Sequence, residues 1–284
     1  MDKSKNKSNI EMLHEVDLAI VKEVVGLCDK HNIKYYMLGG TMLGAIRHNG
    51  FIPWDDDIDL GMYRVDYEKF LQIADRELPQ HLKVVNYHNT PNYHYYITRI
   101  LDVNTKVIEL RIGNEDEKYT NASIDIFPID GTPNNNLLRK IYFFRVMYHR
   151  ALMSLCYKDS IDRERKRSKP EKILLWIMEH LPVERLTTPN KEKRKIDKLM
   201  RRQRVNKSEY IGNLMGAYRT REIVPAAYYG KGKMYLFEDI ELRGLEMADE
   251  YLTHTYGDYM KLPPEDKRKI HFGIVEIHGE KIKV

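Results

Sequence analysis

Two aspartates have the residue type and the spacing to hold a divalent metal ion. Asp57 and Asp59 alternate with Ile58 and Leu60, so an extended backbone would point both carboxylates to one face and both apolar side chains to the other. Carboxylates this close repel each other unless a cation lies between them, and a hard, oxygen-preferring ion such as Mg²⁺ suits them. We therefore predict a Mg²⁺ site, with Mn²⁺ as the alternative ion and Asp55 as an outer ligand.

A third carboxylate, Asp125, is expected to join this site. Ile124 and Ile126 lie on either side of it, so a strand here would carry a lone carboxylate on its polar face. If that strand neighbours the strand of Asp57 and Asp59, the three acids form a cluster of the kind used in two-metal phosphoryl transfer. Asp125 is then a third ligand or a general base. The alternative for Asp57 and Asp59 is a solvated acidic turn, and the alternative for Asp125 is an aspartate held by a local hydrogen bond.

A phosphate-binding turn is predicted just before the acidic residues. An apolar strand at residues 35–38 runs into Gly39-Gly40-Thr41, and a short helix is expected at residues 41–46. Adjacent glycines let the backbone approach a ligand, and the free N–H groups at a helix N-terminus favour an anion. Arg47 is predicted to neutralise phosphate charge and Arg99 is a second candidate. The alternative for Arg47 is an ordinary exposed side chain at a helix end.

The elements that must position these residues follow from hydrophobic periodicity. Apolar residues recur every three or four positions in segments that predict helices at 10–31, 65–78, 137–157, 173–181, 191–204 and 248–256. Runs of β-branched and aromatic residues predict strands at 35–38, 57–61, 82–85, 95–101, 105–110, 121–129, 210–213 and 233–237. The mixture predicts an α/β (α+β) protein whose sheet is flanked by helices.

The segment from Gly39 to Leu60, GGTMLGAIRHNGFIPWDDDIDL, closely resembles the LicD family, to which fukutin and the fukutin-related protein are distant relatives. A looser resemblance continues through residues 123–131 and 256–264. The resemblance implies a nucleotidyltransferase-type mixed sheet. Residues 137–209, between those two blocks, resemble no family that we can name.

The same resemblance implies an activity. The chain is expected to be a LicD-like cholinephosphotransferase, that is, a phosphotransferase for substituted phosphate groups. Its donor would be a CDP-alcohol (CDP-choline, CDP-ribitol or CDP-glycerol), with phosphocholine first among the transferred groups, and CMP would be released. The acceptor would be a hydroxyl of a cell-surface glycan precursor, in lipopolysaccharide or teichoic acid modification. A nucleotidyltransferase that releases pyrophosphate, a metal-dependent glycosyltransferase and a non-catalytic basic binding module stay open as alternatives.

Composition limits the class of protein. The chain has 284 residues of which 42% are hydrophobic, enough for a real core in one elaborated domain or two small ones. No run of about 18 uncharged apolar residues occurs and the N-terminus lacks an apolar signal-peptide segment. We therefore expect a cytoplasmic protein. The two cysteines, Cys28 and Cys156, are expected to be reduced thiols and not a disulfide or a zinc site.

The positive charge of the chain is concentrated in one segment. Residues 137–209 carry a net charge of +12, whereas the rest of the chain carries −7. We predict a basic helical insertion at 137–209, between a catalytic core at 1–136 and a C-terminal part at 210–284 that completes the core. No nucleic acid partner is expected. The predicted partner of the insertion is an anionic membrane surface at the inner face, contacted by Lys191, Lys193, Arg194 and Lys195; the alternative is a solvated helical face.

Overall fold

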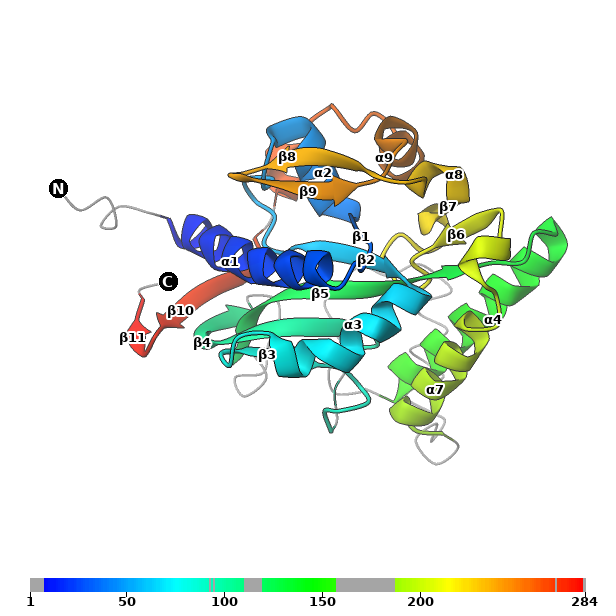
Figure 1. Ribbon diagram of the computed structural model, residues 1–284, viewed down its shortest axis with the longest axis horizontal. Helices are drawn as coiled ribbons and strands as arrows, with labels where there is room; N and C mark the ends of the chain where they lie inside the picture. The colour runs from blue at the N-terminus through cyan, green and yellow to red at the C-terminus, as the bar shows by residue number, and fades with distance from the viewer. Residues whose placement is uncertain are drawn as a thin grey trace.

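The computed structural model describes residues 8–91, 93, 95–109, 119–156, 187–268 and 270–282. Its centre is a nine-stranded mixed sheet (Figure 1). The strands run in the order β1 (Tyr35–Met37), β2 (Asp59–Tyr63), β5 (Tyr119–Gly131), β4 (Thr98–Glu109), β10 (Phe272–Ile277) and β11 (Glu280–Lys281). In addition, β3 (Leu82–Val85) pairs with β4, β6 (Tyr210–Gly212) pairs with β5, and β7 (Ile223–Pro225) pairs with β6. A separate hairpin contains β8 (Lys233–Phe237) and β9 (Ile240–Gly244).

Helices flank this sheet, as predicted. They are α1 (Asn9–Lys30), α2 (Gly39–His48), α3 (Arg64–Glu77), α4 (Asn136–Leu155), α7 (Pro189–Met200), α8 (Ala226–Tyr229) and α9 (Ala248–Tyr256). Short 3₁₀ turns are η4 (Val205–Lys207), η5 (Arg219–Glu222) and η6 (Glu265–Lys267). In Figure 1, α1 and α3 cover the near side of the sheet. Above its β1 edge lie α2, α9 and the β8–β9 hairpin, while α4 and α7 run side by side at the right.

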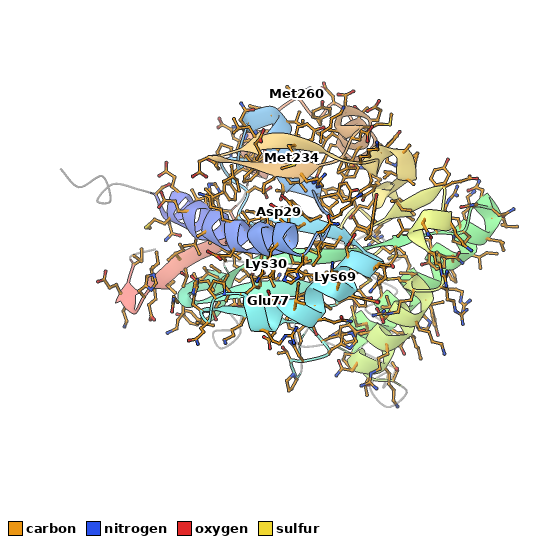
Figure 2. All side chains as sticks on the ribbon, in the orientation of Figure 1. Asp29, Lys30, Lys69, Glu77, Met234 and Met260 are labelled. Atoms are coloured by element: carbon orange, nitrogen blue, oxygen red, sulfur yellow. The ribbon has the colours of Figure 1, made fainter. Side chains whose placement is uncertain are left out.

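Helix boundaries follow from local chemistry. Ser8 caps α1 in a capping box, since its side chain accepts a hydrogen bond from the Glu11 N–H and the Glu11 carboxylate accepts one from the Ser8 N–H at 2.7 Å. Asn135 caps α4 by accepting from the Leu138 N–H at 3.1 Å. At the other end of α1, Lys30 pairs with Glu77 of α3 at 2.7 Å, on the side of the molecule that faces the viewer (Figure 2).

The alternation predicted for β2 and β5 builds the core. Ile58, Leu60, Ile124 and Ile126 are all fully buried, in one cluster with apolar residues of α1 and α3. Burying an aliphatic side chain of this size contributes about 1.5–3 kcal/mol. The polar face of the same strands is thereby left for the carboxylates.

Two predicted boundaries were wrong. The helix expected at residues 41–46 is longer and begins at Gly39, so Gly39-Gly40-Thr41 forms its first turn and does not precede it. The strands expected at 95–101 and 105–110 form the single strand β4, whose pairing with β5 shifts register between Leu101 and Lys106. The polar residues at that irregularity predicted a gap between two strands, but a β-bulge accommodates them within one strand. The helix expected at 173–181 lies outside the described residues.

The predicted basic insertion contributes α4 and α7, which pack on each other. Ile196, Leu199 and Met200 of α7 share a buried cluster with Tyr142 and Val146 of α4. Within the described ranges, no helix is long and apolar enough to cross a membrane. The division into three parts stays a prediction, although β10 and β6 show that residues after 209 complete the sheet.

Candidate active site

The register of a parallel strand pair brings two of the predicted acids together. Strands β2 and β5 run in parallel with Asp59 directly opposite Asp125, and the Asp125 N–H donates to the Ile58 carbonyl at 2.8 Å. Neighbouring strands lie about 4.8 Å apart. Asp57 lies two residues before Asp59, just outside β2, and both aspartates are partly exposed whereas Ile58 between them is buried. The acidic strand and the strand of Asp125 are therefore neighbours, as the sequence analysis required for a shared site.

Two anchors hold the acidic loop that precedes β2. The Asp56 carboxylate is buried and accepts hydrogen bonds from the backbone N–H groups of His271 and Phe272, the second at 2.7 Å. On the other side, the His14 Nε2 lies 2.7 Å from the Asp55 carbonyl oxygen while its ring stacks on Phe51 at 4.0 Å. Asp56 is thus a structural residue. His14, to which the sequence pattern assigned no role, positions Asp55.

Burial and mutual repulsion act on the acids together. Although Asp57 and Asp59 keep partial exposure, the surrounding protein removes most of their hydration, and this raises the pKa of both carboxyls well above the usual range. The charges of the neighbouring aspartates raise the two pKa values further. Burial also raises the pKa of Asp55 to about 6, with the Asp56 charge adding to it and the Arg47 charge opposing it. The cluster carries more negative charge than its surroundings compensate.

This donor set fits a hard divalent cation. The acids of the cluster offer carboxylate oxygens, which Mg²⁺ and Mn²⁺ prefer. No hydrogen bond to the carboxylate of Asp57 or Asp59 occurs among the described residues. Within the same residues, no three His, Cys, Asp or Glu side chains already converge enough to hold a metal ion. One reason is visible: the Asp125 carboxylate is turned toward Arg99, whose Nε donates to it at 2.9 Å.

The predicted phosphate turn is the first turn of α2. Gly39 has a φ of 49°, which favours glycine, and a Cβ there would lie 3.2 Å from the Asp59 carboxylate. A Cβ on Gly40 would overlap the Asp55 carboxylate. The glycines therefore allow a close approach, as predicted, but in this structure it is the carboxylates that approach them.

The three residues of this turn differ in whether their backbone N–H groups already have a hydrogen-bond partner. The Thr41 hydroxyl accepts a hydrogen bond from the Asp59 N–H at 2.8 Å, which joins α2 to β2. The Gly39 N–H donates to the Tyr251 hydroxyl at 3.1 Å. The N–H groups of Gly40 and Thr41 have no partner in the described part of the chain and remain available to an anion.

The two predicted arginines occupy different places. Arg47 donates to the Tyr259 carbonyl at 2.8 Å and faces the charge of Asp55. Arg99 contacts Asp125, and its guanidinium lies 4.0 Å from the centroid of the Tyr95 ring. Arg99 is consequently closer to the acids than its rank as second candidate suggested, and its role in binding substrate stays a prediction.

Several tyrosines and a glutamate near the site were missed by the sequence analysis. Tyr218 and Tyr256 pack edge to face at 5.1 Å, and the Tyr256 hydroxyl lies close to Gly39 and Asp59. Glu222 of η5 is buried and accepts from the Tyr218 N–H at 2.8 Å, and burial raises the pKa of Glu222 to about 7. The looser block at residues 256–264 was the signal that could have found Tyr256.

Acids on adjacent strands, free N–H groups at a helix N-terminus and nearby arginines suit a protein that acts on phosphate-containing groups. The family model described as "LicD/FKTN/FKRP, nucleotidyltransferase domain" matches residues 32–159, a range that includes every predicted site residue.

Comparison of the whole chain agrees with that match. The lipopolysaccharide cholinephosphotransferase LicD of Haemophilus influenzae is 30% identical over 262 residues, which cover 90% of this chain and 93% of that protein. Human ribitol 5-phosphate transferase FKRP is 43% identical over 54 residues, which cover 19% of this chain and 11% of that protein. The chain belongs to the LicD family and is a phosphotransferase.

Proposed function

We propose that this protein transfers a phospho-alcohol, phosphocholine in first place, from a CDP-alcohol to a glycan hydroxyl and releases CMP. The observation that carries the proposal is the pairing of Asp59 with Asp125 beside the first turn of α2. The likeness to a cholinephosphotransferase along nearly the whole chain supports this choice over a nucleotidyltransferase, a glycosyltransferase or a binding module. We place the reaction in the cytoplasm, with a lipopolysaccharide or teichoic acid precursor as the class of acceptor.

The metal part of the proposal assigns Asp57 and Asp59 as ligands of Mg²⁺ or Mn²⁺, with Asp125 as third ligand or base. A bound divalent ion supplies positive charge to the phosphate oxygens and holds the diphosphate in place. The remaining work falls to groups of the chain itself.

The chain offers two sources of charge stabilisation. The N–H groups of Gly40 and Thr41 would donate to a phosphate oxygen, and the N–H groups of Arg99 other than Nε–H have no protein partner among the described residues. Donors placed in advance at a developing negative charge are typically worth about 10²–10³-fold each in rate. Arg47 would contribute through its permanent charge from the other end of α2.

Proton transfer fits Asp125 in its role as base. Burial raises the pKa of Asp125, which makes its carboxylate a stronger base, and the charge and hydrogen bond of Arg99 oppose part of this rise. The acceptor hydroxyl would lose its proton to Asp125 as its oxygen bonds to the phosphorus, and the bond from that phosphorus to the CMP oxygen would break.

The alcohol would lie near the tyrosine pair. A quaternary ammonium has no N–H to donate and binds to aromatic faces, and Tyr218 is 43% exposed beside Tyr256. Trp54, the other aromatic residue near the acidic loop, already has the Arg268 guanidinium 4.8 Å from its ring centroid. We therefore assign the choline methyl groups to Tyr218.

Product release from a panel of nucleotides tests the function. The protein is incubated with CDP-choline, CDP-ribitol, CDP-glycerol, CTP and UDP-glucose, with and without Mg²⁺ or Mn²⁺, and the nucleotide products are separated by chromatography. We expect metal-dependent release of CMP, fastest from CDP-choline. Pyrophosphate from CTP would establish a nucleotidyltransferase instead, and UDP would establish a glycosyltransferase.

A further inference from the structure

The outward face of α4 carries an apolar stripe in a position where a surface helix is normally polar. Leu137, Ile141, Phe144 and Tyr148 follow one another at spacings of four, three and four, and they are 67, 49, 70 and 53% exposed. Such spacing places all four on one side of a helix. A contiguous apolar surface of this kind marks a contact with something outside the monomer.

The charges on α4 are of one sign. The helix contains no Asp or Glu, and it has four Arg or Lys residues. Two of these serve the fold: Arg139 lies 4.0 Å from the centroid of the Tyr210 ring, and Arg150 donates to the carbonyl oxygens of Leu214 and Gly216. The other two, Lys140 and Arg145, flank the apolar stripe and are paired with no acid among the described residues.

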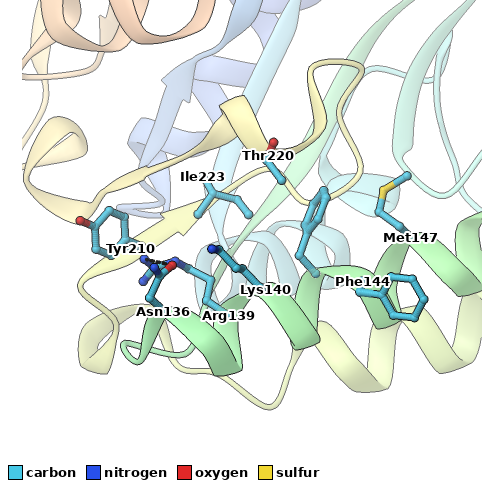
Figure 3. Close-up of a pocket in the computed structure, with 9 residues that line it drawn as sticks. Asn136, Arg139, Lys140, Phe144, Met147, Tyr210, Thr220 and Ile223 are labelled. Carbon is cyan, nitrogen blue, oxygen red and sulfur yellow. Dashed lines mark hydrogen bonds between the residues drawn. The ribbon is translucent and has the colours of Figure 1, made fainter.

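A hollow of about 490 Å³ adjoins the stripe (Figure 3). Phe144 and Met147 of α4 line it together with Tyr210 of β6 and Ile223 of β7. The residue before Ile223 is Glu222, which lies beside Tyr218. The hollow therefore lies between the stripe and the segment that contains Thr220 and Ile223.

We propose that the stripe, its flanking cations and the hollow form a docking surface for an anionic lipid bilayer. Apolar side chains between cations match a membrane interface, where the side chains enter the acyl region and the cations meet lipid phosphates. A second copy of this chain is a poorer partner, because symmetric pairing would bring the same positive residues together. The bilayer would bring a lipid-linked glycan acceptor to Tyr218 and the acids; that purpose, unlike bilayer binding, rests on the proposed function.

This surface replaces the membrane-contacting residues predicted from the sequence. Lys193 is fully buried and donates to the Tyr93 carbonyl, and Lys195 pairs with Glu192 at 2.7 Å. Neither is free to meet a lipid head group. The exposed cations of α7, namely Lys191, Arg194, Lys195 and Lys198, also share one helix face. No exposed large apolar residue accompanies them on α7, whereas Lys140 and Arg145 of α4 lie beside the apolar stripe.

Sedimentation with vesicles tests the proposal without any assay of turnover. Protein is mixed with vesicles of phosphatidylcholine alone or with one third phosphatidylglycerol, and the lipid concentration that pellets half the protein is measured. We expect binding to the anionic vesicles only, and release in 0.5 M NaCl. Ile141→Ser with Phe144→Ser should raise the required lipid concentration at least tenfold, and Lys140→Gln with Arg145→Gln about tenfold.

Matched variants distinguish binding through this face of α4 from non-specific binding to vesicles. Met234→Ser with Leu236→Ser removes two residues of β8 that are 47 and 51% exposed, on a hairpin away from α4 (Figure 2), and Lys191→Gln with Lys195→Gln removes two charges from α7. Both should bind as wild type does. Equal binding by the α4 variants, or no binding by wild type, would overturn the proposal. A wild-type dimer that Phe144→Ser converts to monomer, without vesicle binding, would assign the stripe to self-association and also overturn it.

Discussion

Two groups of buried acids lie on strand β5 and its neighbours, and they differ in how their charge is balanced. Near the end of β5, Asp130 is fully buried and receives two hydrogen bonds from Arg64, one from Nε at 2.8 Å. Arg64 also reaches Asp197 of α7 at 3.2 Å, and Asp197 contacts Arg201 as well. Each acid there has an arginine, and the network attaches α7 to the sheet.

The other group, five residues earlier on β5, is short of positive charge. In the described part of the chain, Arg99 is the one cation that contacts any of Asp57, Asp59 and Asp125, and it contacts Asp125 alone. The comparison separates stability from function. A balanced network needs no further partner, whereas an excess of acidic charge is the pattern expected where a cation from outside the chain binds, as proposed above.

The largest expected effect comes from the unbalanced group. Asp59→Asn or Asp57→Asn should lower metal-dependent CMP release at least about 10³-fold, because a ligand and its charge are lost. The melting temperature should stay the same or rise, since repulsion within the cluster falls. Calorimetry and the release assay measure both, with exposed Asp75→Asn of α3 as the control. Full activity in both variants would remove the metal assignment.

The balanced group should respond in the opposite way. Asp130→Asn leaves the buried Arg64 guanidinium without its counter-charge, which typically costs about 3–5 kcal/mol of stability. Urea denaturation should show this loss, while turnover per folded molecule changes little. Replacing both partners, Arg64→Met with Asp130→Leu, should recover part of the loss. A stable Asp130→Asn variant would show that the network contributes nothing to the attachment of α7.

Glu222 is an intermediate case, because it is buried and hydrogen-bonded but no cation of the described residues forms an ion pair with it. Its pKa is raised from 4.5 to about 7 by burial. The folded state therefore binds this proton more tightly than the unfolded state, and stability falls as the pH rises from about 4.5 to about 7. Glu222→Gln should flatten this dependence by roughly 2–3 kcal/mol at most. Urea denaturation at pH 5 and 7.5 measures how the stability of each variant changes with pH, with exposed Glu241→Gln as the control. The same change with pH in Glu222→Gln and wild type would contradict the prediction.

The smallest expected effect concerns the contact between the acids and α2. Gly40→Ala should displace the Asp55 carboxylate and lower CMP release about tenfold, equivalent to about 1.4 kcal/mol, because the new methyl group would occupy its place. Stability should not fall, since alanine favours a helix by about 1 kcal/mol over glycine. Gly26→Ala in α1, where a Cβ meets nothing within 4 Å, is the matched control. Unchanged turnover in Gly40→Ala would mean that this contact is not needed.

Local sequence patterns predicted most helices and strands, because the periodicity that indicates them depends only on neighbouring residues. The strand at 82–85 and the helix at 248–256 match β3 and α9 to the residue. The alternation from Asp57 to Leu60 correctly placed the apolar side chains in the core. Patterns failed where a distant contact overrides the local signal: β4 continues through polar residues because β5 and β10 pair with it on both sides.

The sequence by itself determined the family and the apolar faces of the main elements, and it supplied the acidic residues now proposed as the site, since these depend on residue type and short spacing. Only the tertiary structure decided that Asp59 stands opposite Asp125, that Arg99 contacts Asp125, and that Tyr256 lies near Gly39. It also decided which basic residues are exposed, burying Lys193 and leaving Lys140 free. Register and burial arise from contacts between segments more than 50 residues apart, and no short sequence pattern records them.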